Sequence, residues 1–129
     1  MTEPSTILVV EDDPLWRRII GHTLSKHNVN VVNVSNLDEA ATALSHSRFD
    51  LLFLDYELPD GKGLDLLDTC RRENVGRVVL VTGYADVHDL NDSRAASVDG
   101  YLTKPFLSSD LVAYLKFTTE LEAARPESN

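Results

Sequence analysis

The stretch that decides the fold is Ile7-Leu8-Val9-Val10-Glu11-Asp12, an apolar run of four residues that ends in two carboxylates. A run this short, rich in branched residues and apolar at every position, is typical of a strand buried between two layers of helices. In a parallel sheet the carboxyl ends of the strands form the edge where ligands bind. The stretch therefore predicts a central parallel strand that delivers acidic side chains to that edge.

Further strands are predicted by similar runs. Leu51–Leu54 ends in Asp55, and Val78–Val81 leads to Thr82. Two weaker runs complete the set: Val29–Val34, and Val98–Thr103, which leads to Lys104. The strands that begin at Ile7, Leu51, Val78 and Val98 are thus each followed by a polar side chain at the carboxyl end.

Helical patterns alternate with these strands. The first predicted helix is capped by Asp13 and has Pro14 at its first position, and the second is capped by Ser35 or Asn36 with Asp38 or Glu39 as the reciprocal acid. The third follows the Pro59-Asp60-Gly61 turn and carries Leu64, Leu67 and Cys70. A weak fourth helix is predicted from Asp86 to Ala96, and a fifth begins at about Ser108 and is ended by Pro126. Five βα repeats predict a doubly wound α/β fold with a five-stranded parallel sheet and right-handed crossovers. We expect one domain over residues 1–129, with a core at about 5–122 and a frayed tail at 123–129.

The overall composition restricts the function. The chain has 129 residues and a formal net charge of −9, from 21 acidic and 12 basic side chains, which disfavours direct binding to nucleic acid. Cys70 is the single cysteine and suits a reducing cytosol. Neither a signal peptide nor an apolar stretch near the ~20 residues of a membrane span is present in the sequence. We therefore expect a cytoplasmic protein without membrane insertion.

The polar strand ends predict one composite site. Two carboxylates about 5 Å apart repel by about 3 kcal/mol at an effective dielectric constant of 20. Glu11, Asp12 and Asp55 would therefore need counter-ions, which Lys104 and a divalent cation can supply. Mg²⁺ fits best, since it takes one or two protein carboxylates, keeps waters and bridges to phosphate oxygens. Asp55 could then accept a phosphoryl group, with Thr82 and Lys104 sharing the developing charge.

Four motifs in this order resemble the receiver domain of two-component response regulators, of the chemotaxis-regulator type, over about residues 5–122. The residues that carry the resemblance are Glu11-Asp12 after Val9-Val10, Asp55-Tyr56-Glu57-Leu58-Pro59 with Gly63, Thr82-Gly83, and Lys104-Pro105-Phe106. The resemblance implies a flavodoxin-like sheet with strand order 2-1-3-4-5. A Glu stands at the first acidic position, where Asp is commoner in the family.

The resemblance also implies roles for the site residues. Asp55 would be the phosphoacceptor and a metal ligand, Asp12 a direct Mg²⁺ ligand, and Glu11 a partner acting mainly through a metal-bound water. The backbone carbonyl of Glu57 would be a further ligand. Lys104 would pair with the phosphoryl group, and its bond to Pro105 is typically cis.

Thr82 and Tyr101 resemble the switch pair of the family. On phosphorylation the hydroxyl of Thr82 moves toward the phosphoryl group and the ring of Tyr101 turns inward, which changes the face built from the fourth helix, fifth strand and fifth helix. Our hypothesis is that Glu57 and Tyr84 control water access and hence the lifetime of the acyl phosphate. Trp16 is expected to be a packing residue or partly exposed.

The resemblance implies a signalling module rather than an enzyme, a phosphoacceptor that assists its own phosphorylation and dephosphorylation. The donor would be a sensor histidine kinase or a histidine phosphotransfer protein, and the output would run through a protein target, a phosphorelay or phosphorylation-dependent self-association. We expect a stand-alone receiver, because the domain fills the chain. Two alternatives are a haloacid-dehalogenase-type phosphohydrolase, which carries its nucleophile on the first strand, and a pseudo-receiver that acts only as an interaction surface.

Overall fold

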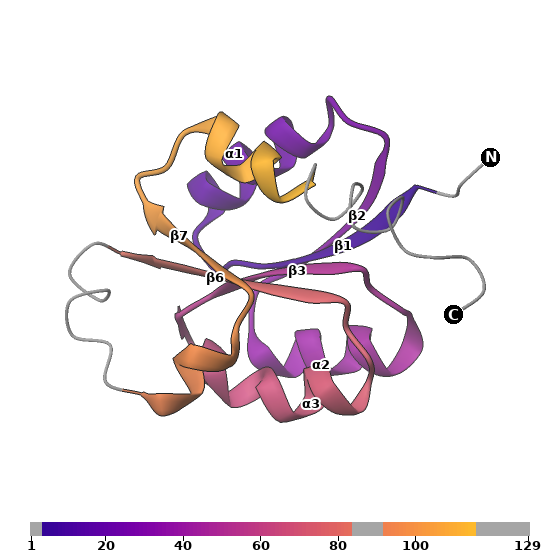
Figure 1. Cartoon of the computed structure of the whole chain (residues 1–129), viewed down its shortest axis with the longest axis vertical. Coiled ribbons are helices and arrows are strands. Elements are labelled where there is room, and N and C mark those ends of the chain that lie inside the picture. The colour runs from indigo at the N-terminus through magenta and orange to yellow at the C-terminus, as the bar shows by residue number, and fades with distance from the viewer. Residues whose placement is uncertain (1–3, 84–91, 116–129) are drawn as a thin grey trace.

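A five-stranded parallel sheet forms the centre of the molecule (Figure 1). The computed structural model describes residues 4–83 and 92–115. The sheet has the order β2-β1-β3-β6-β7, which confirms the predicted order 2-1-3-4-5 because β4 and β5 belong to a separate hairpin. Its strands are β1 Ser5–Val10, β2 Val29–Val34, β3 Leu51–Asp55, β6 Arg77–Gly83 and β7 Gly100–Lys104.

Helices cover both faces of the sheet, as a doubly wound fold requires (Figure 1). They are α1 Pro14–Leu24, α2 Leu37–His46, the 3₁₀ helix η1 Gly63–Leu66, α3 Leu67–Arg72, the 3₁₀ helix η2 Ser93–Ser97 and a helix over residues 108–115. The helix predicted from Asp86 to Ala96 lies partly outside the described residues, and its described end is η2. The predicted end of the last helix and the tail also lie outside them. Within residues 4–83 and 92–115, no helix has the length and apolar character needed to cross a bilayer.

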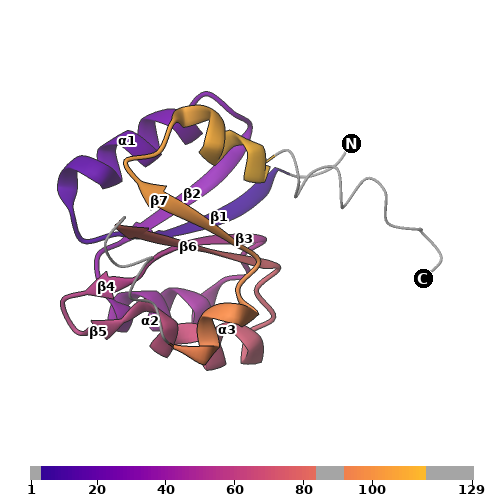
Figure 2. The same ribbon diagram turned by 60° about the vertical axis from the view of Figure 1, so that its left-hand side comes forward.

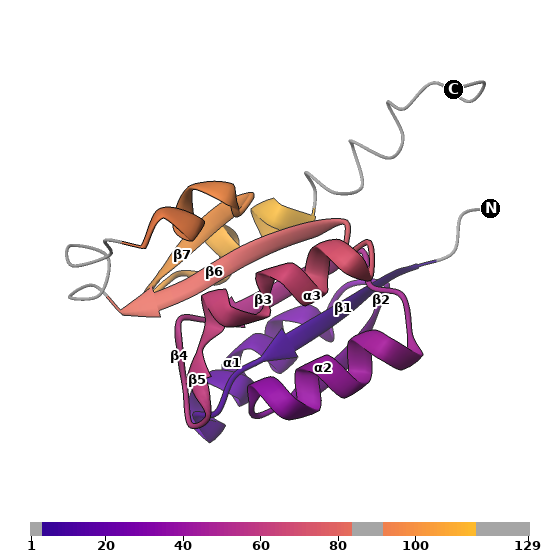
Figure 3. The same cartoon turned by 90° about the horizontal axis from the view of Figure 1, so that it is seen from below.

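The core consists of two buried clusters, one on each side of the sheet. Alternate residues of each inner strand enter opposite clusters, so that in β1 Leu8 faces the side of α2 and α3 while Ile7 faces the side of α1. Leu111 and Leu115 of the last helix join the cluster under α1. Seen from below, α2 and α3 lie over one face of the sheet and run roughly along its strands (Figure 3). Continuous apolar runs therefore form these strands because both faces are covered.

The start of α2 is capped from three directions. Asn36 accepts a hydrogen bond from the backbone N–H of Glu39 (2.8 Å), and the Glu39 carboxylate accepts one from the backbone N–H of Ser35 (2.8 Å). Of the alternatives left open by the sequence, the cap is thus Asn36 and the reciprocal acid is Glu39. The Asp60 carboxylate also accepts from the first two backbone N–H groups of α2, at 2.9 and 3.0 Å. These bonds lower the pKa of Asp60 below its usual range.

A short antiparallel hairpin follows β3 and fixes the chain behind Asp55 (Figure 2). It consists of β4 Glu57–Leu58 and β5 Gly61–Lys62, joined by the predicted turn. The hairpin strands themselves were not predicted, and the following helix begins as 3₁₀ rather than α. Beyond the hairpin, the backbone N–H of Gly63 donates to the carbonyl of Tyr56 (2.7 Å). The chain therefore returns to lie directly against the end of β3.

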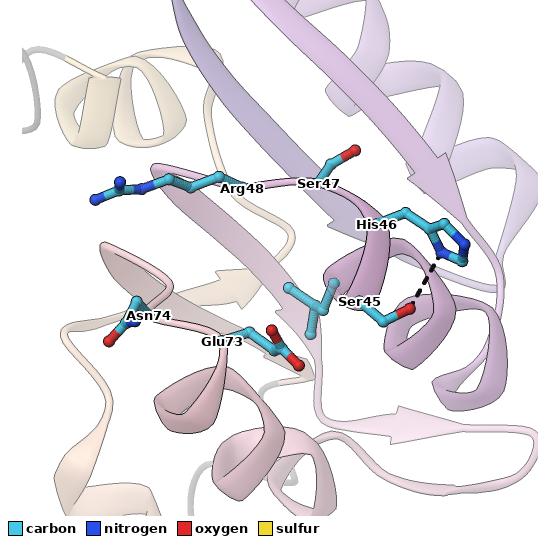
Figure 4. A pocket seen from close by; sticks show the side chains of 7 residues that line it. Ser45, His46, Ser47, Arg48, Glu73 and Asn74 are labelled. Carbon is cyan, nitrogen blue, oxygen red and sulfur yellow. Dashed lines mark hydrogen bonds between the residues drawn. The ribbon is translucent and has the colours of Figure 1, made fainter.

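A shallow polar depression of about 330 Å³ lies near the opposite, amino edge of the sheet (Figure 4). It opens where α2 and α3 end, and its side chains are mostly exposed. Asn74 in its wall adopts a positive φ of 58°, a left-handed conformation that asparagine tolerates where α3 stops. The residues that line it are Leu44, Ser45, His46, Ser47, Arg48, Glu73 and Asn74.

We predict that only glycine fits at position 63, where the chain passes close to the backbone of Asp55. A Cβ atom at Gly63 would lie 2.1 Å from the backbone carbonyl oxygen of Asp55. We expect Gly63→Ala to lower the free energy of unfolding by at least about 1–3 kcal/mol, because backbone has to shift. Chemical denaturation measures the change.

Gly21→Ala is the matched control, since a Cβ atom at Gly21 in α1 meets nothing within 4 Å. This substitution should raise stability by about 0.5–1 kcal/mol through helix propensity. Equal effects of the two substitutions would contradict the close approach at Gly63.

Candidate functional site

The register of the sheet brings the polar strand ends to one edge. Val10 pairs with Leu54 and Asp55 pairs with Val81, so that the residue after β1 lies beside the last residue of β3. On the other side, Gly83 at the end of β6 pairs with Lys104 at the end of β7. Residues from distant parts of the sequence therefore meet because the strands that carry them are in parallel register.

Three carboxylates and one ammonium group converge at this edge. Oxygen atoms of Glu11, Asp12 and Asp55 all lie within 4.8 Å of one another. The Lys104 Nζ atom lies 2.7 Å from Glu11 Oε1 and 3.7 Å from Asp55 Oδ2. Glu11 and Asp55 are buried, with 1% and 8% of their surface exposed, whereas Asp12 is exposed. The predicted residues thus form one cluster, in which Lys104 is closer to Glu11 than to Asp55.

The loop after β1 holds Glu11 in place. Its Oε2 atom accepts a hydrogen bond from the backbone N–H of Asp13 (3.1 Å), and Asp13 in turn caps α1 as predicted. The guanidinium group of Arg17 donates to the Glu11 carbonyl oxygen (3.2 Å) and to Ser35 Oγ (2.8 Å). Arg17 therefore ties the ends of β1 and β2 together, a contact that no motif in the sequence indicated.

Burial and like charge act together on Asp55. Desolvation is the largest cause, followed by the hydrogen bond and the charge of Glu11, and together they raise the pKa of Asp55 from 3.8 to about 8. The positive charge of Lys104 acts in the opposite direction and the charge of Asp12 adds to the increase. One ammonium group does not balance the clustered carboxylates.

The donor set fits a hard divalent cation. Glu11 Oε1 is buried against the Lys104 ammonium, 2.7 Å away, and the same ammonium also faces Asp55 at 3.7 Å. Three carboxylates that offer oxygen atoms within 4.8 Å match the oxygen ligands that Mg²⁺ prefers. The side chain of Glu57 points to another partner, since it forms an ion pair with Lys62 at 2.8 Å. The role of its backbone carbonyl as a ligand stays a prediction.

A family comparison agrees with this geometry. The model of the response regulator receiver domain matches residues 7–116. The chain belongs to this family. Residues 7–116 contain all four sequence motifs, and the observed sheet order is the one expected for a receiver domain of a two-component system.

Curated relatives include longer regulatory proteins. The probable transcriptional regulatory protein TcrX of Mycobacterium tuberculosis is 35% identical over 115 residues, which cover 88% of this chain and 49% of the relative. The phosphate regulon transcriptional regulatory protein PhoB of Escherichia coli is 33% identical over 113 residues, which cover 85% of this chain and 49% of that protein. The chain therefore spans about half the length of these relatives.

Solved structures of receiver domains superpose over nearly the whole chain. A CheY-like receiver domain protein from Methanospirillum hungatei has a TM-score of 0.82 at 27% identity, covering 95% of this chain and 99% of the other. The receiver domain of a sensor histidine kinase from Pseudomonas aeruginosa has a TM-score of 0.78 at 26% identity, covering 88% and 96% of the two chains. In that structure a magnesium ion is coordinated in the active-site cleft.

The two residues expected to form the switch of the receiver domain lie on adjacent strands, β6 and β7, and differ in exposure. Thr82 is fully buried and its hydroxyl donates a long hydrogen bond (3.4 Å) to the carbonyl of Gly83. Tyr101 is 44% exposed, and its hydroxyl donates to the carbonyl of Ala95 in η2. The ring of Tyr101 thus lies outward in this structure. Tyr84, the other residue of the lifetime hypothesis, lies outside the described residues.

Trp16 belongs to the site, which sequence reasoning did not indicate. Its ring stacks on Phe106 with centroids 4.9 Å apart, and Lys104 Nζ lies 5.5 Å from the Trp16 ring centroid. The peptide bond between Lys104 and Pro105 is cis, as expected. Spacing along the chain gave no signal for this contact, because α1 and the segment after β7 are far apart in sequence.

The raised pKa of Asp55 predicts a pH dependence of stability without metal. Between about pH 4 and 8 the folded receiver domain keeps a proton on Asp55 that the unfolded chain has released. The folded state binds more protons in this window, so the free energy of unfolding should fall as the pH rises. Asp55→Asn should remove most of this slope and melt at a higher temperature than wild type near pH 8.

Thermal unfolding between pH 5 and 8 with a chelator present measures both effects. Asp12→Asn is the control. Because Asp12 is exposed, this substitution should raise the melting temperature near pH 8 by less than Asp55→Asn does. A slope that survives unchanged in Asp55→Asn would contradict the electrostatic account.

Proposed function

We propose that the chain is a phosphoacceptor that receives a phosphoryl group on Asp55 from a phosphohistidine. The donor is a sensor histidine kinase or a histidine phosphotransfer protein. One observation carries the proposal, namely that a buried carboxylate at the end of β3 lies between two acidic side chains and one ammonium group. Family membership and the sheet-edge position of the cluster support it.

The chain's own residues position the reaction. A carboxylate oxygen of Asp55 attacks phosphorus while the bond from phosphorus to the imidazole nitrogen of the donor breaks. Lys104, 3.7 Å from Asp55, is placed to pair with the transferred group, and the Thr82 hydroxyl would donate to it after a rotation. The same groups act on water during hydrolysis, so the domain assists both steps without turning over a free substrate.

Mg²⁺ would be held by Asp12 and Asp55 directly, by Glu11 through a water and by the backbone carbonyl of Glu57. When bound, it neutralises charge on the carboxylates and on the phosphoryl oxygens. The three carboxylates that offer oxygen atoms within 4.8 Å of one another, beside a single ammonium group, support a cation at this place.

Output would run through a switch and a protein target. Thr82 moving toward the phosphoryl group would leave room for Tyr101 to turn inward from its exposed position, changing the face formed by β7 and the helices beside it. A downstream protein or a second copy of the domain would read this face. The charge of −9 argues against direct contact with nucleic acid, and the composition suits the cytoplasm.

Apolar side chains near the mouth of the site offer contacts for the donor. Leu15 and Ile19 on α1 are 62% and 37% exposed, and Leu107, three residues past Lys104, is 69% exposed. The segment that carries Leu107 contacts α1 on either side of this residue, through Phe106 on Trp16 and Ser108 on Thr23. Exposed apolar residues gathered in one region commonly mark a protein interaction surface. We place the phosphohistidine protein against Leu15, Ile19 and Leu107.

Incubation with Mg²⁺ and acetyl phosphate tests the proposed reaction. We expect labelling that stops at one phosphoryl group per chain, that is lost in Asp55→Asn and that slows strongly in Lys104→Met. Intact-mass measurement at successive times gives the stoichiometry. Asp68→Asn, which changes a 92% exposed carboxylate on α3, is the control and should label like wild type.

The result separates the three functions considered. Continuous release of phosphate far above one equivalent would mean a phosphohydrolase. Absence of both label and turnover would mean a pseudo-receiver.

Mg²⁺ should also raise the melting temperature, because it binds the folded domain and relieves repulsion among the carboxylates. The shift should shrink in Asp12→Asn, which removes a proposed ligand, and remain in Asp68→Asn. Thermal unfolding at several millimolar concentrations of Mg²⁺ measures it. A shift of the same size in Asp12→Asn and wild type would place the ion elsewhere.

A further inference from the structure

The Lys104 ammonium lies between two carboxylates, those of Glu11 and Asp55, and is attracted to both. It lies 2.7 Å from Glu11 Oε1 and 3.7 Å from Asp55 Oδ2. Lysine is a compact charge on a flexible stem of four carbons, so its position depends on the surfaces around it. With 17% of its side chain exposed, Lys104 is largely enclosed by its neighbours.

One wall of this enclosure is aromatic. Trp16, in the first turn of α1, stacks on Phe106 with ring centroids 4.9 Å apart and an interplanar angle of 34°. Phe106 packs on the buried cluster beneath α1, whereas Trp16 is half-buried and belongs to neither buried cluster of the described residues. Trp16 therefore covers the site rather than filling the core.

The Trp16 ring is close enough to attract the ammonium group. Lys104 Nζ lies 5.5 Å from the ring centroid, inside the range of about 6 Å in which the negative face of an indole attracts a cation. Tryptophan is the strongest of the aromatic side chains in this interaction, and partial burial strengthens it. The ring therefore forms a third attractive contact for the ammonium group, beside Glu11 and Asp55.

We infer that Trp16 is a positioning residue for phosphoryl transfer, which holds the Lys104 ammonium beside Asp55 through its ring face. Phe106 holds the Trp16 ring in place, and the stacked pair shields one side of the ammonium from water. The inference rests on the proposed function, because it assigns Trp16 to the same reaction.

The kinetic test compares side chains of similar apolar character with and without a ring. Initial rates of Asp55 labelling by acetyl phosphate with Mg²⁺ are measured for wild type, Trp16→Leu and Trp16→Phe. We expect a loss of about three- to tenfold in Trp16→Leu and a smaller loss in Trp16→Phe, whose ring attracts cations less strongly. Arg18→Ala, an exposed change on the same helix, is the control and should match wild type.

A double-mutant cycle with Lys104→Met distinguishes positioning from a structural role. If Trp16 acts through Lys104, adding Trp16→Leu to Lys104→Met should produce no further loss of rate. A wild-type rate in Trp16→Leu, or the same fold loss in both backgrounds, would overturn the inference.

A spectroscopic test leaves Trp16 unchanged and therefore does not depend on how the variants at that position fold. Trp16 is the sole tryptophan, so indole fluorescence reports on this contact. Adding Mg²⁺ with beryllofluoride, which mimics a phosphoryl group, should shift the emission of wild type as Lys104 moves. The shift should be lost in Lys104→Met, and an equal shift in both proteins would overturn the inference.

Failure of the two proposals can be told apart. If wild-type protein is not phosphorylated by acetyl phosphate, both the proposed function and this inference are contradicted. If wild-type protein and Trp16→Leu are phosphorylated at the same initial rate, only the inference about Trp16 is contradicted.

Discussion

Glu11 and Asp55 are held side by side because β1 and β3 are adjacent parallel strands buried on both faces. The backbone that carries them is held by strands whose side chains are buried on both faces. The resulting repulsion is built into the fold rather than into a flexible loop. Burial, together with the hydrogen bond and charge of Glu11, raises the pKa of Asp55 to about 8 despite Lys104. A cation or an added group at this edge therefore acts on a strained arrangement that the core maintains.

The surroundings of Asp55 divide into fixed and adjustable parts. On the backbone side of Asp55, Gly63 lies so close to the Asp55 carbonyl that a Cβ atom would not fit between them. The adjoining hairpin is bonded to the start of α2 through Asp60. In front, Asp12 is exposed and Lys104 reaches in on a flexible stem, limited by the ring of Trp16. A rigid acceptor with movable charged neighbours suits phosphoryl transfer, because the acceptor oxygen stays in place while the charges rearrange.

The parallel sheet and the convergence of its polar ends could be predicted from the continuous apolar runs of the strands, and the strand order from the resemblance to receiver domains. Details that depend on long-range contacts could not. The bond from Asp60 to α2 crosses more than 20 residues, and the hairpin that carries it has strands of two residues, too short for any periodicity. Lys104 was expected as a counter-ion for the clustered carboxylates together. That its shortest contact is with Glu11 could not be predicted, since relative distances depend on side-chain packing. The stack of Trp16 on Phe106 was missed for the same reason.

The backbone at Tyr101 is fixed although its ring is exposed. The Tyr114 hydroxyl accepts a hydrogen bond from the Tyr101 N–H (3.0 Å) and donates one to the Tyr101 carbonyl (3.1 Å), so that it takes the place of a neighbouring strand at the edge of the sheet. Gly100 makes this contact possible, because a Cβ atom there would lie 2.4 Å from the Tyr114 ring. A change in Tyr101 can therefore be confined to its side chain, whose hydroxyl holds η2 through Ala95. Turning that ring would release η2 while β7, and with it Lys104, stays in register.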